Sequence, residues 1–428
     1  MKKQKICLWA LCGLIGMGMV GCGNTEQANS EGEGGKSDGE VTTITFSLWD
    51  EIQSVTYEKI IDAFEEEHPE IHVEMQLTPW DQYWTKFDAA AGANQAADTF
   101  FMNVNYAKYL EAGVMESIQP WIEKDGFDTS GFTPALIDLF TYDGELVAMP
   151  KGMDSQAVAY NQEIFDQYGV EAPTDEWTWD DFMNLCAELK EKIGDDGIYP
   201  IGMAWNSSNS TWNHVMWQFG GHMFQDEQAV FNSPENVEAF DAMTSMVENG
   251  YAPDYSTISD TSAEDLFISG KTAMLYLPTF TAQKLEQSSL KGIHLVTLPE
   301  AQTKDYMLGG MSYGMNSASQ HKDEAWEFLK FLGGEEANKI LGENGADMPA
   351  LADCQHYYAE SYKNFDATPF VDQINYSRPY EAAPYYATDE AQTIYNEHMI
   401  DIFSGNEGVE EGLAAIDQEI NEVIEANK

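Results

Sequence analysis

Residues 42–113 alternate between stretches with a two-residue hydrophobic period and stretches whose apolar residues are spaced as on a helix. Three stretches read as strands, the last of them a buried one: 42–50, 71–80 and 98–103. The stretches between and after them read as helices: 55–71, 82–96 and 106–113. Such alternation predicts an α/β unit with a parallel sheet, because parallel neighbours need a crossover connection.

Two later helices are predicted from the residues at their ends. Residues 174–194 carry Thr178 as a predicted N-cap, with two aspartates after it that face the positive end of the helix dipole. Residues 232–250 carry Ser233 as a cap, a proline at the first helical position and Gly250 as the stop. The second part of the chain therefore continues the helical pattern.

The N-terminal residues are not part of the predicted fold. A basic start precedes the apolar run Ile6–Val20, which is shorter than the about 20 residues of a membrane-spanning helix and suits a signal peptide. The run ends in Met-Val-Gly before Cys22, which resembles a bacterial lipobox, where the cysteine becomes the lipidated first residue. We expect residues 1–21 to be a lipoprotein signal peptide, with plain secretion and cleavage nearby as the alternative.

Residues 22–40 contain almost no apolar side chains, so they cannot bury enough surface to offset the entropy lost on ordering. We expect a flexible tether after a lipid anchor at Cys22. The anchor would hold the protein at the cell surface, on the outer face of the bacterial cytoplasmic membrane, as its only membrane contact. The segment 41–428 is too long to fold around one simple hydrophobic core, so two domains or lobes are expected.

The charge of the chain and its cysteines limit the classes of ligand, metal and cofactor that we expect. The chain has 73 acidic and 21 basic residues, a formal charge of −52, which excludes nucleic acid and favours a neutral or cationic ligand. After Cys22 only Cys186 and Cys354 remain; Cys186 shares an apolar helical stripe and reads as a buried inert thiol, with a disulfide as the alternative. Two lone cysteines and eight histidines without metal-binding spacing predict no metal and no cofactor.

Polar and aromatic residues follow each of the three predicted strands: Trp49, Asp50, Trp80, Asn103 and Asn105. In open α/β sheets, ligands bind beyond the carboxyl ends of the strands, so these residues form one candidate binding surface. Trp80 could instead cap the strand edge, and Asn103 could simply hold a turn.

Several longer motifs occur in a fixed order within residues 44 to about 350: YEKIIDAFEEEHPEIHVEMQ, AAAGANQAADTFFMN, YDGELVAMPKGMDSQAVAYNQEIFDQYGV, WTWDDFMNLCAELK, DLFISGKTAMLYLPTF, GGMSYGMNSASQHKDEAWEFLKFL and NGADMPAL. Together, and behind a lipobox, they resemble the extracellular solute-binding protein family of carbohydrate ABC importers, which are maltose-binding-protein-like. The resemblance implies capture of a neutral mono- or oligosaccharide by hinge closure and its delivery to the permease subunits of an importer, by a protein expected to be a monomer.

The resemblance also implies the type II periplasmic-binding-protein-like α/β fold, with two lobes, each a mostly parallel sheet flanked by helices, and a three-segment hinge. It assigns 41–150 and 283–333 to lobe 1, and 151–282 and 334–428 to lobe 2. The implied crossings between the lobes lie near Lys151–Asp154, Phe280–Gln283 and Gly333–Glu336.

A sugar offers flat C–H faces, which aromatic rings match, and hydroxyls, which carboxylates and amides bond in pairs. The positions that match the family's binding residues in the later part of the chain are Asp154, Trp212, Phe280, Ser312 and Tyr313. Asp154 could instead be a solvated loop acid.

Two groups of aromatic and basic residues remain: the pair Arg378 and Tyr380, and the tryptophans Trp205, Trp212 and Trp217. Arg378 and Tyr380 lie in a proline- and tyrosine-rich stretch, where the arginine could bond a sugar with two nitrogens or pair with a surface acid. Trp212 begins a short predicted helix that faces the ligand, and Trp217 lies further along it in the core. Trp205 is consistent with either role.

Two other functions are compatible with an acidic, aromatic-rich surface. A glycoside hydrolase needs two carboxylates about 5–10 Å apart, and Asp50 and Asp154 are the only pair that the sequence offers. A surface adhesin with the same fold would bind no small molecule. The resemblance favours a binding protein over an enzyme.

Overall fold

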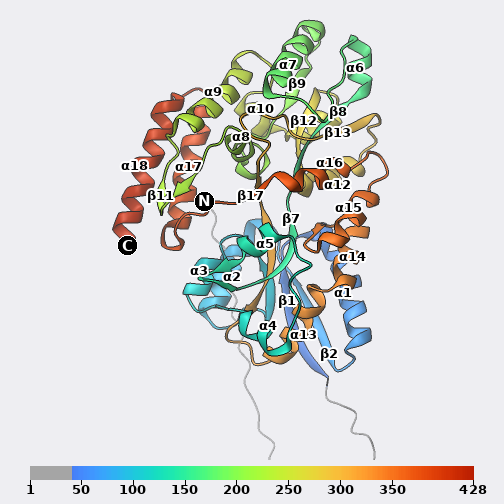
Figure 1. The fold of residues 1–428 in the computed structure, drawn as a ribbon, viewed down its shortest axis with the longest axis vertical. Coiled ribbons are helices and arrows are strands. Elements are labelled where there is room, and N and C mark those ends of the chain that lie inside the picture. The colour runs from blue at the N-terminus through green and yellow to red at the C-terminus, as the bar shows by residue number, and fades with distance from the viewer. Residues whose placement is uncertain (1–40) are drawn as a thin grey trace, which may run out of the picture. The chain divides into compact units, whose positions relative to one another are not determined.

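Two sheets organise the part of the chain that the computed structural model describes, residues 41–428 (Figure 1). The predicted signal peptide 1–21, the tether 22–40 and the lipid site Cys22 lie outside the described residues. Among the residues described, no helix has both the length and the apolar character needed to cross a membrane.

The first sheet has seven strands in the order β16-β7-β15-β3-β1-β2, with β4 paired to β15. Its strands are β1 (Thr42–Leu48), β2 (Ile71–Leu77), β3 (Thr99–Met102), β4 (Met115–Glu116), β7 (Met149–Met153), β15 (Gly310–Asn316) and β16 (Met348–Pro349). β1 pairs in parallel with β2 and β3, which confirms the prediction from the alternating pattern. The other pairs are antiparallel, because β15 enters the sheet only after the chain has passed through the second sheet.

The second sheet has four strands in the order β13-β8-β12-β9. They are β8 (Gln156–Asn161), β9 (Tyr199–Gly202), β12 (Thr272–Pro278) and β13 (Ile293–Val296). Only β9 and β12 pair in parallel, while β8 is antiparallel to both of its neighbours. The prediction of mostly parallel sheets is therefore wrong for the strand pairing of both sheets, which are mixed.

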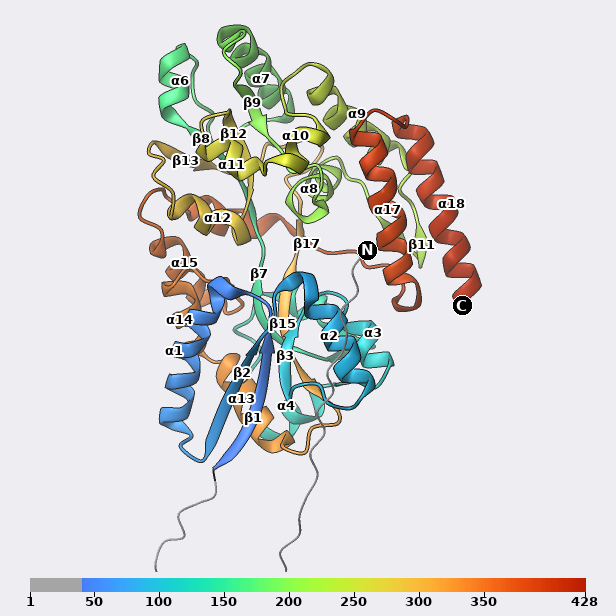
Figure 2. The same ribbon diagram turned by 180° about the vertical axis from the view of Figure 1, so that it is seen from behind.

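Helices cover both faces of the first sheet (Figure 2). They are α1 (Glu51–Glu67), α2 (Trp80–Gly92), α3 (Tyr106–Glu111), α4 (Gln119–Asp125), α5 (Pro134–Leu139), α13 (Lys322–Leu332) and α14 (Glu335–Glu343). Phe100 and Phe101 of β3 point to opposite faces, as strand geometry requires. Phe100 packs against Phe87 of α2, whereas Phe101 packs against Tyr57 of α1.

The second sheet and the C-terminal part hold the remaining helices. They are α6 (Gln162–Tyr168), α7 (Trp179–Ile193), α8 (Trp212–Gln218), α9 (Pro234–Glu248), α10 (Tyr255–Asp260), α11 (Ala263–Ile268), α12 (Thr279–Glu286), α15 (Gln355–Ser361), α16 (Thr368–Gln373), α17 (Thr388–Phe403) and α18 (Val409–Asn427). Helices α17 and α18 pack side by side, and α18 also contacts α9. Three two-stranded sheets complete the structure: β5 (Thr141–Tyr142) with β6 (Glu145–Leu146), β10 (Phe224–Gln225) with β11 (Gln228–Ala229), and β14 (Tyr306–Leu308) with β17 (Ser377–Pro379).

Both predicted helix caps are confirmed. The Thr178 hydroxyl accepts a hydrogen bond from the Asp181 N–H at 3.1 Å, and the Asp181 carboxylate accepts one from the Thr178 N–H at 2.9 Å. The Ser233 hydroxyl accepts from the Asn236 N–H at 3.2 Å. Each cap satisfies backbone donors that the first helical turn leaves without partners.

Strand pairing places two segments in a different sheet from the one that their predicted lobe implies. β13 pairs with β8 in the second sheet, although 283–333 was assigned to lobe 1. β16 pairs with β7 in the first sheet, although 334–428 was assigned to lobe 2. Neither short strand follows a pattern that distinguishes one sheet from the other, so their partners could not be deduced locally.

The chain passes between the two sheets in three places. The first passage, at Asp154 and Ser155 between β7 and β8, agrees with the prediction. The second runs through β14 to Gly309, and the third lies between β16 and α16. The predicted crossings at Phe280–Gln283 and Gly333–Glu336 are wrong, because the first lies in α12, before the chain returns to β13, and the second joins two helices of the first sheet.

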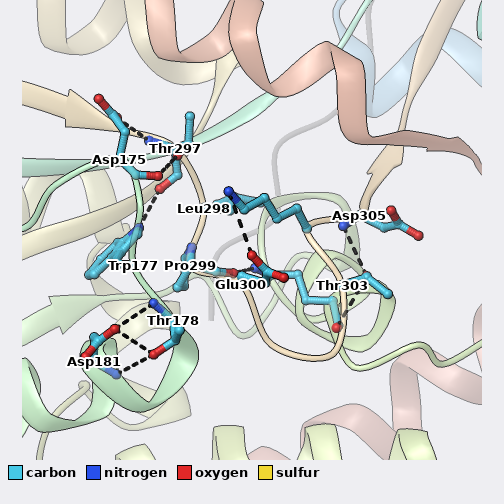
Figure 3. A network of polar contacts seen from close by, with 12 residues as sticks. Asp175, Trp177, Thr178, Asp181, Thr297, Leu298, Pro299, Glu300, Thr303 and Asp305 are labelled. Carbon is cyan, nitrogen blue, oxygen red and sulfur yellow. Dashed lines mark hydrogen bonds and ion pairs between the residues drawn. The ribbon is translucent and has the colours of Figure 1, made fainter.

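Residues 297–305, which lead from β13 towards β14, are fastened to the loop before α7 (Figure 3). Trp177 Nε1 donates to the Thr297 carbonyl at 2.8 Å, and the Glu300 N–H donates to the Trp177 carbonyl at 2.9 Å. Asp175 accepts from the Thr297 N–H at 3.1 Å. These long-range bonds tie the segment to the second sheet's side of the molecule.

The two cysteines of the described part are free and buried. Cys186 lies on the inner face of α7, as its apolar stripe predicted. The alternative of a disulfide between Cys186 and Cys354 is therefore ruled out in this structure.

Candidate functional site

A cavity of about 420 Å³ is lined by residues from both sheets and from the passages between them. Its first-sheet wall comes from the ends of β1 and β3, including Trp49 and Phe101. Its second-sheet wall includes Phe280 at the start of α12 and Asn209 in the loop before α8. A volume of this size lies within the range of about 300–1,000 Å³ that is usual for small-molecule sites.

Aromatic rings form the widest part of the wall. The Trp49 ring centroid lies 5.2 Å from that of Trp80 and 5.2 Å from that of Phe101, with each pair edge-on. Trp80 is 55% exposed and Phe280 is 49% exposed, large values for side chains that normally lie inside a protein. Their faces are available for stacking against an apolar ligand surface.

Asp154 places a carboxylate at the first passage between the sheets. Its N–H donates to the Gly309 carbonyl at 2.9 Å, so two passages are bonded to each other at this point. The pKa of Asp154 is raised to about 7, mainly by burial and also by the neighbouring Asp347 carboxylate, while Lys151 opposes the rise. Only burial and neighbouring charges shift this pKa, and no side chain or N–H group of residues 41–428 donates a hydrogen bond to the carboxylate. Its oxygens can therefore accept hydrogen bonds from a ligand.

A buried ion pair joins Lys151 and Asp347 in the cavity wall. Lys151 is 1% exposed, and its ammonium lies 5.0 Å from the centroid of the Phe101 ring. Asp347 also accepts from the Met348 N–H at 2.9 Å. The pair neutralises two charges that would be costly to bury alone.

Two polar side chains at the start of α1 also line the cavity. Asp50 is the N-cap of α1, and its Oδ1 accepts from the N–H groups of Ile52 and Gln53 at 2.8 and 3.0 Å. Gln53 Oε1 is buried, and it has no hydrogen-bond partner among residues 41–428. A buried acceptor without a partner is costly, so it is suited to receive a ligand hydroxyl.

The structure brings seven of the predicted site residues together on this cavity: Trp49, Asp50, Trp80, Asn103, Asp154, Phe280 and Tyr380. Asn105 does not line it, but it lies next to Trp80 and Asn103 in two smaller hollows. Asn103 also holds a turn, because its Oδ1 accepts from the Asn105 N–H at 2.9 Å. The strand-end surface predicted from the parallel pairing therefore exists.

Four predicted site residues lie elsewhere: Trp212, Ser312, Tyr313 and Arg378. Trp212 is 1% exposed and packs between Phe240 and Tyr395 in the core. It turns inward because the residues before it, including Asn209, fill the position at the cavity.

Ser312 and Tyr313 lie in the middle of β15, between β3 and β7, where both faces of the strand are covered. The Ser312 hydroxyl donates to the Met102 carbonyl, and the Tyr313 hydroxyl shares a hydrogen bond with Tyr57. The cavity is lined instead by Gly309, just before β15, and by Gly310 and Met311 at the start of that strand.

Arg378 pairs with an acidic residue, which was the alternative to sugar binding in the sequence analysis. Its Nε lies 3.2 Å from Asp305 Oδ2, a guanidinium nitrogen donates to the Gly221 carbonyl, and the group lies 5.3 Å from the centroid of Trp217. Trp217 is fully buried, as predicted. Trp205 is also core, with its Nε1 donating to the Pro253 carbonyl at 2.8 Å.

Several cavity residues were not predicted: Gln53, Phe101, Lys151, Asn209, Thr279, Met307, Asp347 and Tyr358. Phe101 and Gln53 adjoin predicted strand ends, so the strand-end rule extended by a few residues would have found them. Asp347 lies in the NGADMPAL motif, but nothing in that motif marked it as a site residue, and Tyr358 carried no signal beyond its residue type.

Exchanging Trp80 and Trp212 for alanine should separate binding from stability. Trp80→Ala removes an exposed ring and is expected to weaken ligand binding about tenfold with little change in melting temperature. Trp212→Ala removes a buried ring and is expected to lower the free energy of unfolding by about 3–5 kcal/mol. Calorimetric titration and thermal unfolding of both variants test this, and equal losses of stability would contradict it.

Comparison with known proteins agrees with the geometry. Residues 49–339 match the family model of the bacterial extracellular solute-binding protein. The chain is similar to an uncharacterized ABC transporter extracellular-binding protein of Pyrococcus horikoshii, with 23% identity over 309 residues that cover 69% of each protein.

Two solved structures share the fold over most of the chain. An ABC substrate-binding protein from Listeria monocytogenes, solved in complex with cycloalternan, has 25% identity and a TM-score of 0.81, covering 90% of this chain and 99% of that one. The sugar-binding protein MalE from Xanthomonas citri has 20% identity and a TM-score of 0.78, covering 90% and 98%. On the family match, which extends over more than half of its length, the chain belongs to the bacterial extracellular solute-binding proteins.

Proposed function

We propose that the protein captures a neutral sugar or oligosaccharide in the cavity between its two sheets and delivers it to the permease of an ABC importer. The observation that carries this proposal is the pairing of exposed aromatic faces with unused hydrogen-bond acceptors on one cavity. Trp80 and Phe280 offer stacking surfaces, while Asp154 and Gln53 offer oxygens without partners among the described residues. A sugar presents the complementary C–H faces and hydroxyls.

The charges on the cavity wall argue against an anionic ligand. Lys151 and Asp347 neutralise each other, which leaves Asp154 and the capping residue Asp50 as the remaining charged groups. An anionic ligand would meet two carboxylates without a free cation opposite them. The similarity to an ABC substrate-binding protein that was solved in complex with cycloalternan supports a ligand of that class.

Capture would proceed by closure about the three passages between the sheets. We place lobe 1 at residues 41–153 and 310–350 and lobe 2 at 156–308 and 368–428, because these segments supply the strands of each sheet and the helices packed on it. A ligand that touches both walls stabilises the closed form, because only that form offers both sets of contacts. Lipid anchoring at Cys22, action as a monomer and docking on a permease belong to the same proposal.

The proposal includes no chemistry on the ligand. The family and its fold neighbours are binding proteins, which favours this reading over a glycoside hydrolase. Asp50 and Asp154, the pair that a hydrolase would need, both line the cavity, but one Asp50 oxygen is engaged in capping α1.

A screen of neutral mono- and oligosaccharides by thermal unfolding tests the function. A true ligand should raise the melting temperature with concentration, since it binds only the folded state. Small-angle scattering with that ligand should show a smaller radius of gyration, and chromatography should recover the sugar intact. Hydrolysis products would favour the enzyme, and no stabilisation by any saccharide would favour an adhesin.

A further inference from the structure

The cavity continues outward past Trp80 through two smaller hollows. The nearer hollow, about 100 Å³, shares Trp80, Asn103 and Tyr380 with the cavity. The farther hollow, about 280 Å³, shares Trp80, Asn105 and Gln392 with the nearer one. Because they share walls, the hollows adjoin the cavity and each other, and both reach helix α17; we call the two hollows together the outer groove.

The outer groove repeats the chemistry of the cavity. Its aromatic wall is formed by Trp80 and Trp84, whose ring centroids lie 5.9 Å apart at a nearly perpendicular angle. Its amide groups come from Asn105 on the first-sheet side and from Gln392 on α17. Aromatic rings together with amides suit a chain of hydroxyl-bearing rings, as they do in the cavity.

The charges of the outer groove are engaged with one another. Lys108 Nζ lies 2.7 Å from Asp389 Oδ2 and 4.0 Å from Asp88 Oδ2. Asp88 also accepts a hydrogen bond from the Tyr109 hydroxyl at 2.9 Å. The ion pair between Lys108 and Asp389 crosses from α3 to α17 at the far end, so the groove offers no free cation to an anionic ligand.

We propose that the natural ligand is an oligosaccharide longer than a disaccharide, with its inner rings in the cavity and its outer rings in the outer groove. The buried Lys151–Asp347 pair closes part of the cavity wall, and the two hollows beside Trp80 offer room for further rings of a chain held by Asp154. Asn105 and Gln392 then bond the hydroxyls of the outer rings. This inference rests on the proposed function and specifies the length of the ligand.

Calorimetric titration with saccharides of increasing length tests the inference. The probes are glucose and the α-1,4-, α-1,6- and β-1,4-linked glucose oligomers from the disaccharide to the pentasaccharide. In the series that binds, affinity should continue to rise beyond the disaccharide. Gln392→Ala should weaken binding of the tetrasaccharide roughly threefold to tenfold and leave the disaccharide unchanged, since one neutral hydrogen bond is lost.

Two further variants make the result specific. Asn105→Ala should act as Gln392→Ala does, whereas Asn396→Ala, which removes an exposed amide of α17 outside the groove, should change no affinity. The inference is overturned if affinity peaks at the mono- or disaccharide, or if the groove variants weaken all lengths equally. If no saccharide of any length binds, the proposed function itself fails, and the two failures are thereby distinguished.

Discussion

Replacing Asp154 with asparagine is expected to weaken sugar binding about 10- to 100-fold at pH 8. The carboxylate lines the cavity with no hydrogen bond from residues 41–428 contributing to its pKa, so ligand hydroxyls would be its donors. Hydrogen bonds to a charged acceptor contribute about 1.5–3 kcal/mol, and about 1.4 kcal/mol corresponds to a tenfold change in affinity. Isothermal titration at one temperature measures the change. Asp62→Asn, an exposed change on α1 away from the cavity, serves as the control.

The same residue predicts a pH dependence. Burial raises the pKa of Asp154 to about 7, so the carboxyl group is mostly protonated at pH 5.5 and mostly ionised at pH 8.5. If the ionised form accepts the ligand hydroxyls, affinity should rise up to about tenfold per pH unit below 7 and level off above it. Asp154→Asn should flatten this profile, and a slope that persists in the variant would assign the titration to another group.

The sign of the stability effect is opposite. A carboxyl group whose pKa is higher in the folded state than in the unfolded state holds its proton more tightly when folded. In the absence of ligand, its contribution to stability therefore falls as pH rises from about 4 to about 7, and it is constant above that. The melting temperature of Asp154→Asn relative to the parent should rise over that interval.

Removing the positive partner of the buried ion pair is expected to give a large loss of stability. Lys151→Met leaves the Asp347 carboxylate buried without its cation and should lower the free energy of unfolding by about 3–5 kcal/mol. Denaturant unfolding followed by tryptophan fluorescence measures the loss. The cost arises from the stranded charge rather than from lost packing, since methionine resembles the lysine stem in size.

A double variant separates these two causes. Lys151→Met combined with Asp347→Leu removes both charges and should recover most of the stability lost in Lys151→Met. A double variant as unstable as the single one would show that packing around Lys151, and not the charge of Asp347, sets the cost. Lys284→Met, at an exposed ion pair with Asp265, should cost less than about 1 kcal/mol and provides the surface reference.

The first wall of the cavity could be predicted because it follows from local pattern and one rule of sheet geometry. β1, β2 and β3 are short-range parallel neighbours, so the residues after each strand must meet at one edge. Trp49, Trp80 and Asn103 were found in this way. Asp154 and Phe280 came from the resemblance, and both line the cavity.

The other wall depends on contacts that no local pattern encodes. Lys151 and Asp347 are separated by 196 positions, and only the antiparallel pairing of β7 with β16 brings them together. The prediction that Ser312 and Tyr313 line the site was wrong for a related reason. β15 is a central strand, so its middle is buried on both faces and only its start reaches the cavity. The prediction that Trp212 contacts the ligand was wrong because the loop before it, and not the tryptophan, lines the cavity.

The hydrogen bond between Asp154 and Gly309 has a consequence for the order of events in binding. It joins two of the three passages about which the proposed closure would turn, so the Asp154 carboxylate would lie near the axis of rotation and would move least. A ligand could therefore form its first contact while the walls are apart, and closing would follow as a separate first-order step. In stopped-flow fluorescence the observed rate should then level off at high sugar concentration, and its plateau would report the closing rate.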